Sequence, residues 1–386
     1  MELKTLKNKG KRSTKWGGGY MKNILTIGSN CFYQALSVIL KRIDLLDWVL
    51  EYSEPCFIYN KDYYIDFERD DPEKTLAKEN PLIFDHDPVS SYYNDYITKC
   101  NNNYKESLVS ECEYTYMEDD STLNFNDINE HFFSNHIQVA ISIDTYYLLE
   151  DYIKKRCYFE KWHNYHFVVI DHLKNSKCYI IDNYFNFEGY VDTKKLDIAY
   201  HSIEKDRGRK RVWWIDSNKL GDLQKNLNRD NHLLTLCKRY LNKRQSINEH
   251  EYITNSEGIR VFNQDYKDIA QILNNRYGQY APQHILYALM GFYLQKLGLS
   301  QLFIYLNENN INAKLENLSY YYNESEKYWS KFTRILERTY LKRKSVIDTI
   351  DNIHNVLSEI QLIESHIEEE TEKIKEQIEN GENVLI

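Results

Sequence analysis

Three residues have the types and the order that acyl transfer through a thiol requires. Cys31 begins an apolar pattern, His166 lies near the start of the apolar run YHFVVIDH, and Asp182 lies near the end of the next run, KCYIIDNY. A cysteine can attack an acyl carbon, a histidine can take up and return the proton, and a carboxylate can orient the imidazole. Together these residues predict a nucleophile, a general base and acid, and an orienting group.

The element that presents Cys31 is a predicted helix. Apolar residues follow it at steps of three and four, which is typical of one helix face: Phe32, Ala35, Leu36, Ile39 and Leu40. The first turn of a helix favours a thiolate, and its N–H groups can bind an oxyanion. A cysteine at this position also suits a packed core, so both interpretations stay open.

The elements that present His166 and Asp182 are two predicted strands joined by the polar segment LKNSK. We expect the turn to centre on Lys174 and Asn175. His166 then lies opposite Asp182 or its neighbour Asn183, and paired Cβ atoms are about 5 Å apart. The alternatives are a structural histidine and an aspartate that forms a turn.

The chain divides into a mixed part and a helical part, so we predict an α+β protein. Short β-like runs occur at 137–144, 165–172, 177–184 and 211–216, and helical spacing dominates beyond about residue 225. The predicted domains are a catalytic domain over residues 21–222, with an N-terminal helix and an antiparallel sheet, and an all-helical domain over residues 223–386. Residues 1–20, basic and rich in glycine, are expected to be a disordered leader or an expression remnant.

Composition limits the partners. The formal charge of −9 disfavours nucleic acid as a partner. The basic segment KDRGRKR at 205–211 suits either a solvated loop or an acidic protein partner. Its aromatic neighbours are limited to Trp213 and Trp214, which gives little support for a nucleic-acid surface. The sequence has no apolar run of membrane-spanning length and no secretory signal pattern, so we expect a cytoplasmic protein without a membrane partner.

Cysteine and histidine spacing gives no support for a metal site. The seven cysteines are scattered and odd in number, which is typical of reduced thiols in the cytoplasm. His163 and His166 form an HxxH pair, but no Cys or Asp pattern completes a ligand set. We expect no metal.

Three segments together resemble the butirosin-type acyltransferase family: NCFYQALSVIL, ISIDTYYLLEDY and HFVVIDHLKNSKCYIIDNY. The last of these also resembles papain-like peptidases that clip double-glycine leaders. The helical segments SEGIRVFNQDYKDIAQIL and ESEKYWSKFTRILER are similar to that family's second domain. The resemblance covers most of residues 24–365. It implies a papain-like fold and an enzyme of secondary metabolism that forms amides, as a relative does in making closthioamide from carrier-bound acyl units and a diamine.

The resemblance implies roles for single residues. Cys31 would carry the acyl group from an acyl or peptidyl carrier protein, and His166 and Asp182 would serve its transfer to a primary amine. Phosphopantetheine enters only as part of the carrier substrate, so no cofactor of the enzyme itself is expected. Papain-like peptidases have a glutamine shortly before the cysteine, whereas this chain has ILTIGSN. The oxyanion donors are then Asn30, Ser29 or the N–H of Cys31.

Three further residues are candidates for binding the amine: Asp144, Tyr146 and Tyr147 in the segment ISIDTYY. A carboxylate can attract the cationic amine, and tyrosines can frame a pocket. The alternative is that Asp144 caps a turn and both tyrosines pack. Two other functions remain open: a cysteine peptidase or amidase, and a binding protein in which Cys31 only packs.

Overall fold

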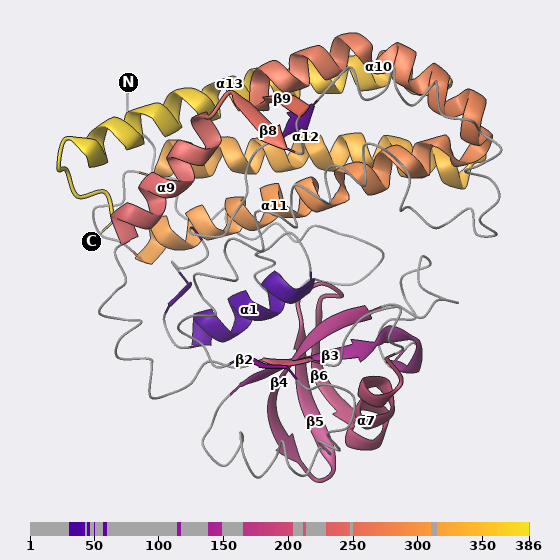
Figure 1. Ribbon diagram of the computed structural model, residues 1–386, viewed down its shortest axis with the longest axis vertical. Helices are drawn as coiled ribbons and strands as arrows, with labels where there is room; N and C mark the ends of the chain where they lie inside the picture. Colours follow the sequence, from indigo (N-terminus) through magenta and orange to yellow (C-terminus); the bar gives the residue numbers. More distant parts are fainter. Residues whose placement is uncertain are drawn as a thin grey trace, which may run out of the picture. The chain divides into compact units, whose positions relative to one another are not determined.

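The computed structural model describes residues 31–42, 45–46, 50, 57–59, 114–116, 138–148, 165–203, 211–213, 229–247, 250–309 and 315–385 of the 386-residue chain (Figure 1). The predicted leader over residues 1–20, the oxyanion candidates Ser29 and Asn30, His163, Trp214 and residues 205–210 lie outside these residues. The predicted domain border between residues 222 and 223 lies outside them too, so it stays a prediction.

The chain forms two compact units. The sheet unit comprises described residues of 34–39 and 114–213, and the helical unit comprises described residues of 31–33, 40–59 and 229–385. The α+β class is therefore confirmed.

Within the described residues, six antiparallel strands form the sheet of the first unit, in the order β2-β7-β3-β4-β5-β6. Their bounds are β2 (Tyr114–Tyr116), β3 (Val139–Asp144), β4 (Tyr165–Lys174), β5 (Lys177–Asp182), β6 (Phe187–Asp192) and β7 (Arg211–Trp213). The four predicted runs that contain β3, β4, β5 and β7 are confirmed as strands. Strand β6 was not predicted, because its sequence FEGYVD has a glycine at its centre.

The hairpin of β4 and β5 differs from the prediction at its turn. Lys174 pairs with Lys177, and Asn175 and Ser176 both have positive φ, 51° and 56°, as a two-residue type I′ turn requires. The turn therefore centres one residue later than predicted. A bulge between Ile170 and His172 then shifts the register, so that Val169 pairs with Ile181.

One face of the sheet packs into an apolar core with α7 (Thr193–His201). Strand β5 alternates regularly, with Cys178, Ile180 and Asp182 buried. Helix α7 contributes Leu196, Ala199 and Tyr200 to the core, and the Asp192 carboxylate caps its start by accepting the N–H of Lys194 at 2.8 Å. The short helix η3 (Thr145–Leu148) follows β3 and adds Leu148.

The predicted helix after residue 30 is present as α1 (Cys31–Arg42). Ala35, Leu36, Ile39 and Leu40 are buried, as the predicted apolar face requires. Residues 34–39 belong to the sheet unit, whereas Cys31 belongs to the helical unit.

Long helices make up most of the helical unit: α9 (Arg229–Leu241), α10 (Asn255–Tyr277), α11 (Ala281–Asn309), α12 (Glu316–Leu341) and α13 (Ile350–Glu379), with the short helices η6 (Gly278–Tyr280) and η7 (Val346–Thr349). Helix α13 packs along α10 and α12, and α11 packs along α12 (Figure 1). The apolar residues of α13 recur at helical spacing and are largely buried, including Ile353, Val356, Leu357, Ile360 and Ile367. No helix in the described ranges is long and apolar enough to cross a membrane.

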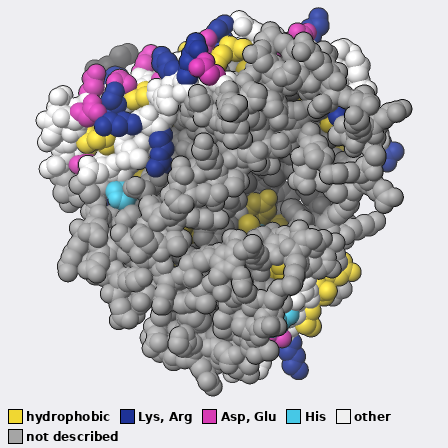
Figure 2. Space-filling model, viewed as in Figure 1, with side chains coloured by type: hydrophobic (Ala, Val, Ile, Leu, Met, Phe, Trp, Pro, Cys, Tyr) yellow, Lys and Arg dark blue, Asp and Glu magenta, His cyan; other side chains and the backbone are white. Residues whose placement is uncertain are grey.

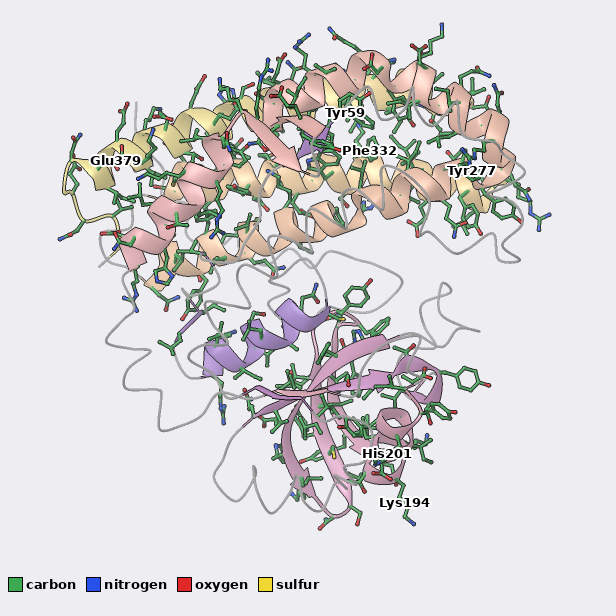
Figure 3. The ribbon with its side chains drawn as sticks, viewed as in Figure 1. Tyr59, Lys194, His201, Tyr277, Phe332 and Glu379 are labelled. Carbon is green, nitrogen blue, oxygen red and sulfur yellow. The ribbon has the colours of Figure 1, made fainter. Side chains whose placement is uncertain are left out.

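The prediction of an all-helical second domain is wrong at one place. Strands β8 (Arg244–Ile247) and β9 (His250–Thr254) form a hairpin, and β1 (Ile58–Tyr59) adds to β9. The segment RQSINEHEYIT is polar and lacks a long apolar alternation, so its strands gave no clear signal. The Tyr59 hydroxyl donates to the Asp265 carboxylate of α10 at 3.1 Å; Figure 3 labels Tyr59 among the side chains of the helical unit.

The core of the helical unit holds a buried ion pair. Lys296 and Glu364 are both 0% exposed, and the Lys296 Nζ lies 2.7 Å from Glu364 Oε2. Tyr240 and Ser325 each donate a hydroxyl to the Glu364 carboxylate at 2.6 Å. The ammonium also lies over the rings of Tyr240 and Tyr322, at 5.1 and 4.9 Å from their centroids. The Glu364 carboxylate of α13 thus connects to side chains of α9, α11 and α12.

The described surface of the helical unit mixes both signs of charge. Lysines lie beside glutamates one turn away, as in Lys327 with Glu324 and Lys373 with Glu370. Figure 2 shows the same mixture of dark blue and magenta side chains.

Candidate active site

His166 occupies the second position of β4 and points into the protein. It pairs with Ile143 of β3 and is 4% exposed. The alternation of a strand puts His166 on the same face as Val168 and Ile170, which belong to the apolar core. The imidazole is therefore held in a position that water hardly reaches.

Asp182 contacts His166 as the sequence predicts. Its Oδ2 lies 2.9 Å from His166 Nε2, and the carboxylate is 2% exposed. In the register that pairs Val169 with Ile181, Asp182 comes opposite Val168 and lies diagonal to His166. Diagonal neighbours on one face are within reach of long side chains, so the contact forms although the predicted direct opposition is wrong.

Asp182 also shapes the turn that follows it. Its other oxygen, Oδ1, accepts the N–H of Phe185 at 3.1 Å, and the N–H of Asn186 donates to the carbonyl of Asn183 at 3.2 Å. The role of turn former, offered as the alternative, is thus present together with the contact to the imidazole. The turn fixes the carboxylate, and the carboxylate fixes the ring.

Two aromatic side chains of the same turn lie against the imidazole. The rings of Tyr184 and Phe185 lie edge to face with the His166 ring, with centroids at 5.4 and 4.9 Å. Neither residue was predicted as part of the site. The signal was available in the sequence, because an aspartate at a strand end followed by NYF places aromatic residues in the next turn.

Cys31 stands at the first position of α1 and is partly exposed. Among the cysteines that the structure describes, Cys178 and Cys237 are instead buried, and burial raises the pKa of each thiol to about 12. A nucleophilic thiol has to ionise and to meet its substrate, so Cys31 fits that role better than either buried cysteine. Cys31 and His166 belong to different units, and their approach stays a prediction.

Asp144 ends β3 opposite Tyr165 and forms a turn. It is 5% exposed, and its Oδ1 accepts the N–H of Tyr146 at 3.0 Å. Alternation along β3 places Asp144 on the face opposite to that of Ile143 and His166. The structure thus shows the turn-capping role, and a role of Asp144 in attracting the amine stays a prediction.

Tyr146 and Tyr147 are partly exposed and pack against each other, so neither is a core residue. They are 44% and 37% exposed, and their rings lie edge to face at 5.4 Å. Helix η3, which carries them, begins two residues after Ile143, the partner of His166. A role in binding an amine stays a prediction for both.

Within the described residues, no group of three His, Cys, Asp or Glu side chains has the arrangement of a metal site. In comparisons with known proteins, no protein-family model and no curated protein matches this chain. The resemblance to butirosin-type acyltransferases therefore stays an expectation carried by the segments quoted above.

Proposed function

We propose that this protein is a cysteine-dependent acyltransferase that moves an acyl group from a carrier-protein thioester, through Cys31, to a primary amine. The observation that carries the proposal is the buried contact between His166 Nε2 and Asp182 Oδ2, at 2.9 Å. Such a contact orients an imidazole for proton transfer.

The contact assigns roles to the two ring nitrogens. An ionised carboxylate only accepts hydrogen bonds, so a neutral His166 ring donates its Nε2–H to Asp182. Nδ1 is then the nitrogen left to accept the proton of the Cys31 thiol in the proposed reaction. The rings of Tyr184 and Phe185 pack edge to face against the imidazole and help to hold its orientation.

In the first step, the Cys31 sulfur attacks the thioester carbonyl, the carbon–sulfur bond to the carrier breaks, and the carrier thiol leaves with a proton. Thioester exchange conserves the bond type, so its equilibrium is close to balanced. The first-turn N–H groups of α1 suit an oxyanion, and Ser29 and Asn30 are further proposed donors.

In the second step, an amine attacks the acyl-enzyme, His166 accepts the amine proton, and Cys31 leaves as the thiol. Near pH 7 an alkyl amine of pKa about 10 is neutral in only about one molecule in a thousand, so the site must bind and deprotonate it. The exposed Tyr146 and Tyr147 are the proposed contacts for the amine. Asp144, which caps the turn that carries both tyrosines, is the proposed contact for the charge of the amine.

The finer features of the proposal follow the family resemblance. They are a papain-like fold of the catalytic domain, an acyl or peptidyl carrier protein as donor, a place in secondary metabolism and a cytoplasmic location. The basic segment 205–211 is the proposed contact for an acidic carrier.

Intact-protein mass spectrometry after incubation with an acyl thioester tests the proposal. With each adduct assigned to a residue by peptide mapping, we expect acylation of Cys31 in the wild-type protein, its loss in Cys31→Ala, and its retention in Cys237→Ala, whose thiol is buried. The absence of an adduct on Cys31 in the wild type would contradict the proposal and favour a binding protein.

Addition of a primary diamine to the acylated protein then separates transfer from hydrolysis. Amide formation faster than release of the free acid supports the acyltransferase. Release of the acid alone would instead identify a hydrolase, such as a peptidase or amidase, on the same residues.

A further inference from the structure

A cluster of one histidine and two tyrosines lies on the sheet, and the proposed reaction at Cys31 does not use it. The register aligns His172, Tyr179 and Tyr190 in one row across β4, β5 and β6. The His172 ring stacks on Tyr179 with centroids 4.9 Å apart and an interplanar angle of 12°, and Tyr190 lies edge-on to both. Strand β6 ends the sheet order, and Tyr190 is 46% exposed, so its ring can meet a reagent from solution.

A chain of hydrogen bonds ends on the Tyr190 hydroxyl. Asp171, at the bulge of β4, lies with Oδ2 2.8 Å from His172 Nδ1, and its other oxygen accepts the amide of Gln138. His172 Nε2 lies 3.1 Å from the Tyr190 oxygen. The bulge lets Asp171 and His172, neighbours in sequence, meet through their side chains.

The chemistry of these groups assigns the protons. An ionised Asp171 can only accept, so a neutral His172 ring carries its hydrogen on Nδ1 and presents Nε2 as an acceptor. The Tyr190 hydroxyl then donates to Nε2. This is the order carboxylate, imidazole, hydroxyl, in which an imidazole removes the proton of an attacking oxygen.

Tyr179, in the same row, provides a contrast within the protein. Its hydroxyl donates to the Glu188 carboxylate at 2.8 Å. Desolvation and this carboxylate raise the pKa of Tyr179 to about 12. A phenol paired with a carboxylate keeps its proton, whereas a phenol paired with an imidazole can pass the proton on.

We propose that Tyr190 is a second nucleophile, a phenol that accepts an acyl group from an activated acyl donor, with His172 as its base and Asp171 as a positioning residue. In the step, the Tyr190 oxygen bonds to the acyl carbon and the bond from that carbon to the leaving group breaks. The phenolic proton moves to His172 Nε2 and from there to the leaving group. The product is an aryl ester on the exposed edge strand β6.

Acetylation by N-acetylimidazole, mapped by peptide mass spectrometry, tests the proposal. Tyr280 and Tyr320 are 42% and 58% exposed and bracket the 46% of Tyr190, so accessibility alone predicts an intermediate rate for Tyr190. We expect Tyr190 to react at least about tenfold faster than both, since general-base assistance typically gives a hundredfold or more. A Tyr190 rate between those of Tyr280 and Tyr320 would overturn the proposal.

Variants separate base assistance from local packing. His172→Phe keeps an aromatic ring against Tyr179 and removes the acceptor nitrogen, so Tyr190 should fall to the rates of Tyr280 and Tyr320. Asp171→Asn retains His172 and serves as a second variant if His172→Phe disturbs folding. It should lower the acetylation rate of Tyr190 severalfold without changing that of Tyr320. An unchanged Tyr190 rate in both variants would contradict the roles of His172 and Asp171.

The cluster is independent of the proposed acyl-enzyme. Cys31→Ala should leave acetylation of Tyr190 unchanged, whereas Tyr190→Phe should leave acylation of Cys31 unchanged. Loss of Tyr190 acetylation in Cys31→Ala would overturn the assignment of His172 as its base.

Discussion

At the scale of single residues, Asp182 does two things with one carboxylate. One oxygen contacts His166 Nε2, and the other accepts the N–H of Phe185. Because both partners are buried, removal of the carboxylate leaves two polar groups without that acceptor.

Asp182 substitutions should separate these two contributions. Asp182→Ala should reduce acyl transfer on the order of 10³–10⁴-fold and destabilise the protein by about 2–3 kcal/mol. Asp182→Asn has one oxygen for two donors, so it should retain more stability than Asp182→Ala while still losing most activity. Rates of acyl-enzyme formation and urea unfolding measure both quantities, and full activity in Asp182→Ala would contradict the assignment.

The described cysteines should differ in reactivity. Burial raises the pKa of Cys178 and Cys237 to about 12, so at pH 8 both remain thiols within the core, whereas Cys31 is partly exposed. We expect iodoacetamide to alkylate Cys31 at least about tenfold faster than either buried cysteine in the folded protein. Peptide mapping after timed quenching gives the rates, and denaturation in urea should make the three rates similar. Equal rates in the folded protein would contradict the assignment of Cys31 as the reactive thiol.

At the scale of elements, Asn255 joins three segments of the helical unit. It has a φ of +49° and is 1% exposed. Its Oδ1 accepts the N–H of Phe57 at 3.0 Å, its own N–H donates to the Phe57 carbonyl at 2.8 Å, and its Nδ2 donates to the Tyr240 carbonyl. Asparagine tolerates the left-handed region better than most residues, so one side chain meets both requirements.

Asn255 substitutions should rank by what each one removes. Asn255→Gly keeps the backbone conformation and loses the side-chain bonds. Asn255→Ala loses the bonds and adds strain, so it should be the more destabilising, by about 1 kcal/mol beyond a loss of about 2–3 kcal/mol shared by both. Thermal and urea unfolding measure the order. If Asn255→Ala were more stable than Asn255→Gly, the left-handed backbone conformation would not be the reason for an asparagine at this position.

At the scale of the whole molecule, the two units use buried polar groups differently. In the sheet unit, the His166–Asp182 contact lies among aromatic rings of one turn. In the helical unit, Lys296 and Glu364 connect four helices at 0% exposure. Taking both charges out of water is costly, and the hydroxyls of Tyr240 and Ser325 help to offset that cost.

The ion pair predicts strong non-additivity. Lys296→Met alone or Glu364→Gln alone should destabilise the protein by about 3–5 kcal/mol, because each leaves one buried charge without its partner. The double variant should lose much less, since the amide that replaces the Glu364 carboxylate can accept from Tyr240 and donate to Ser325. A double-mutant cycle in urea measures the coupling, and additive losses would contradict a close buried pair.

Alkaline pH should destabilise the fold through its buried thiols. Burial raises the pKa of Cys178 and Cys237 from 9.0 to about 12, so above pH 9 the unfolded chain binds fewer protons than the folded chain. The free energy of unfolding then decreases by about 1.4 kcal/mol per pH unit and per thiol, between pH 9 and pH 12. Urea unfolding between pH 8.5 and 10.5 should show this slope, and the Cys178→Ala/Cys237→Ala variant should show a shallower one. Equal slopes for the two proteins would contradict the attribution of this pH dependence to the thiols of Cys178 and Cys237.

The sequence by itself determined the local features. Periodicity and one short hairpin predict the helical spacing after Cys31 and in α13, the strands β3, β4 and β5, and the proximity of His166 to Asp182. These features depend on residues close in sequence, where the period of apolar side chains fixes which face is buried.

Only the tertiary structure decided the rest. The exact position of the turn at Asn175–Ser176 and the bulge at Asp171 were set by how β4 pairs with β5. The addition of β1 to β9 and the Lys296–Glu364 pair depend on contacts between distant segments. Such contacts leave no period in the sequence, because a strand edge or a buried charge is satisfied by whichever segment the fold brings to it. The row of His172, Tyr179 and Tyr190 likewise became visible only in three dimensions, because it depends on the register of three strands.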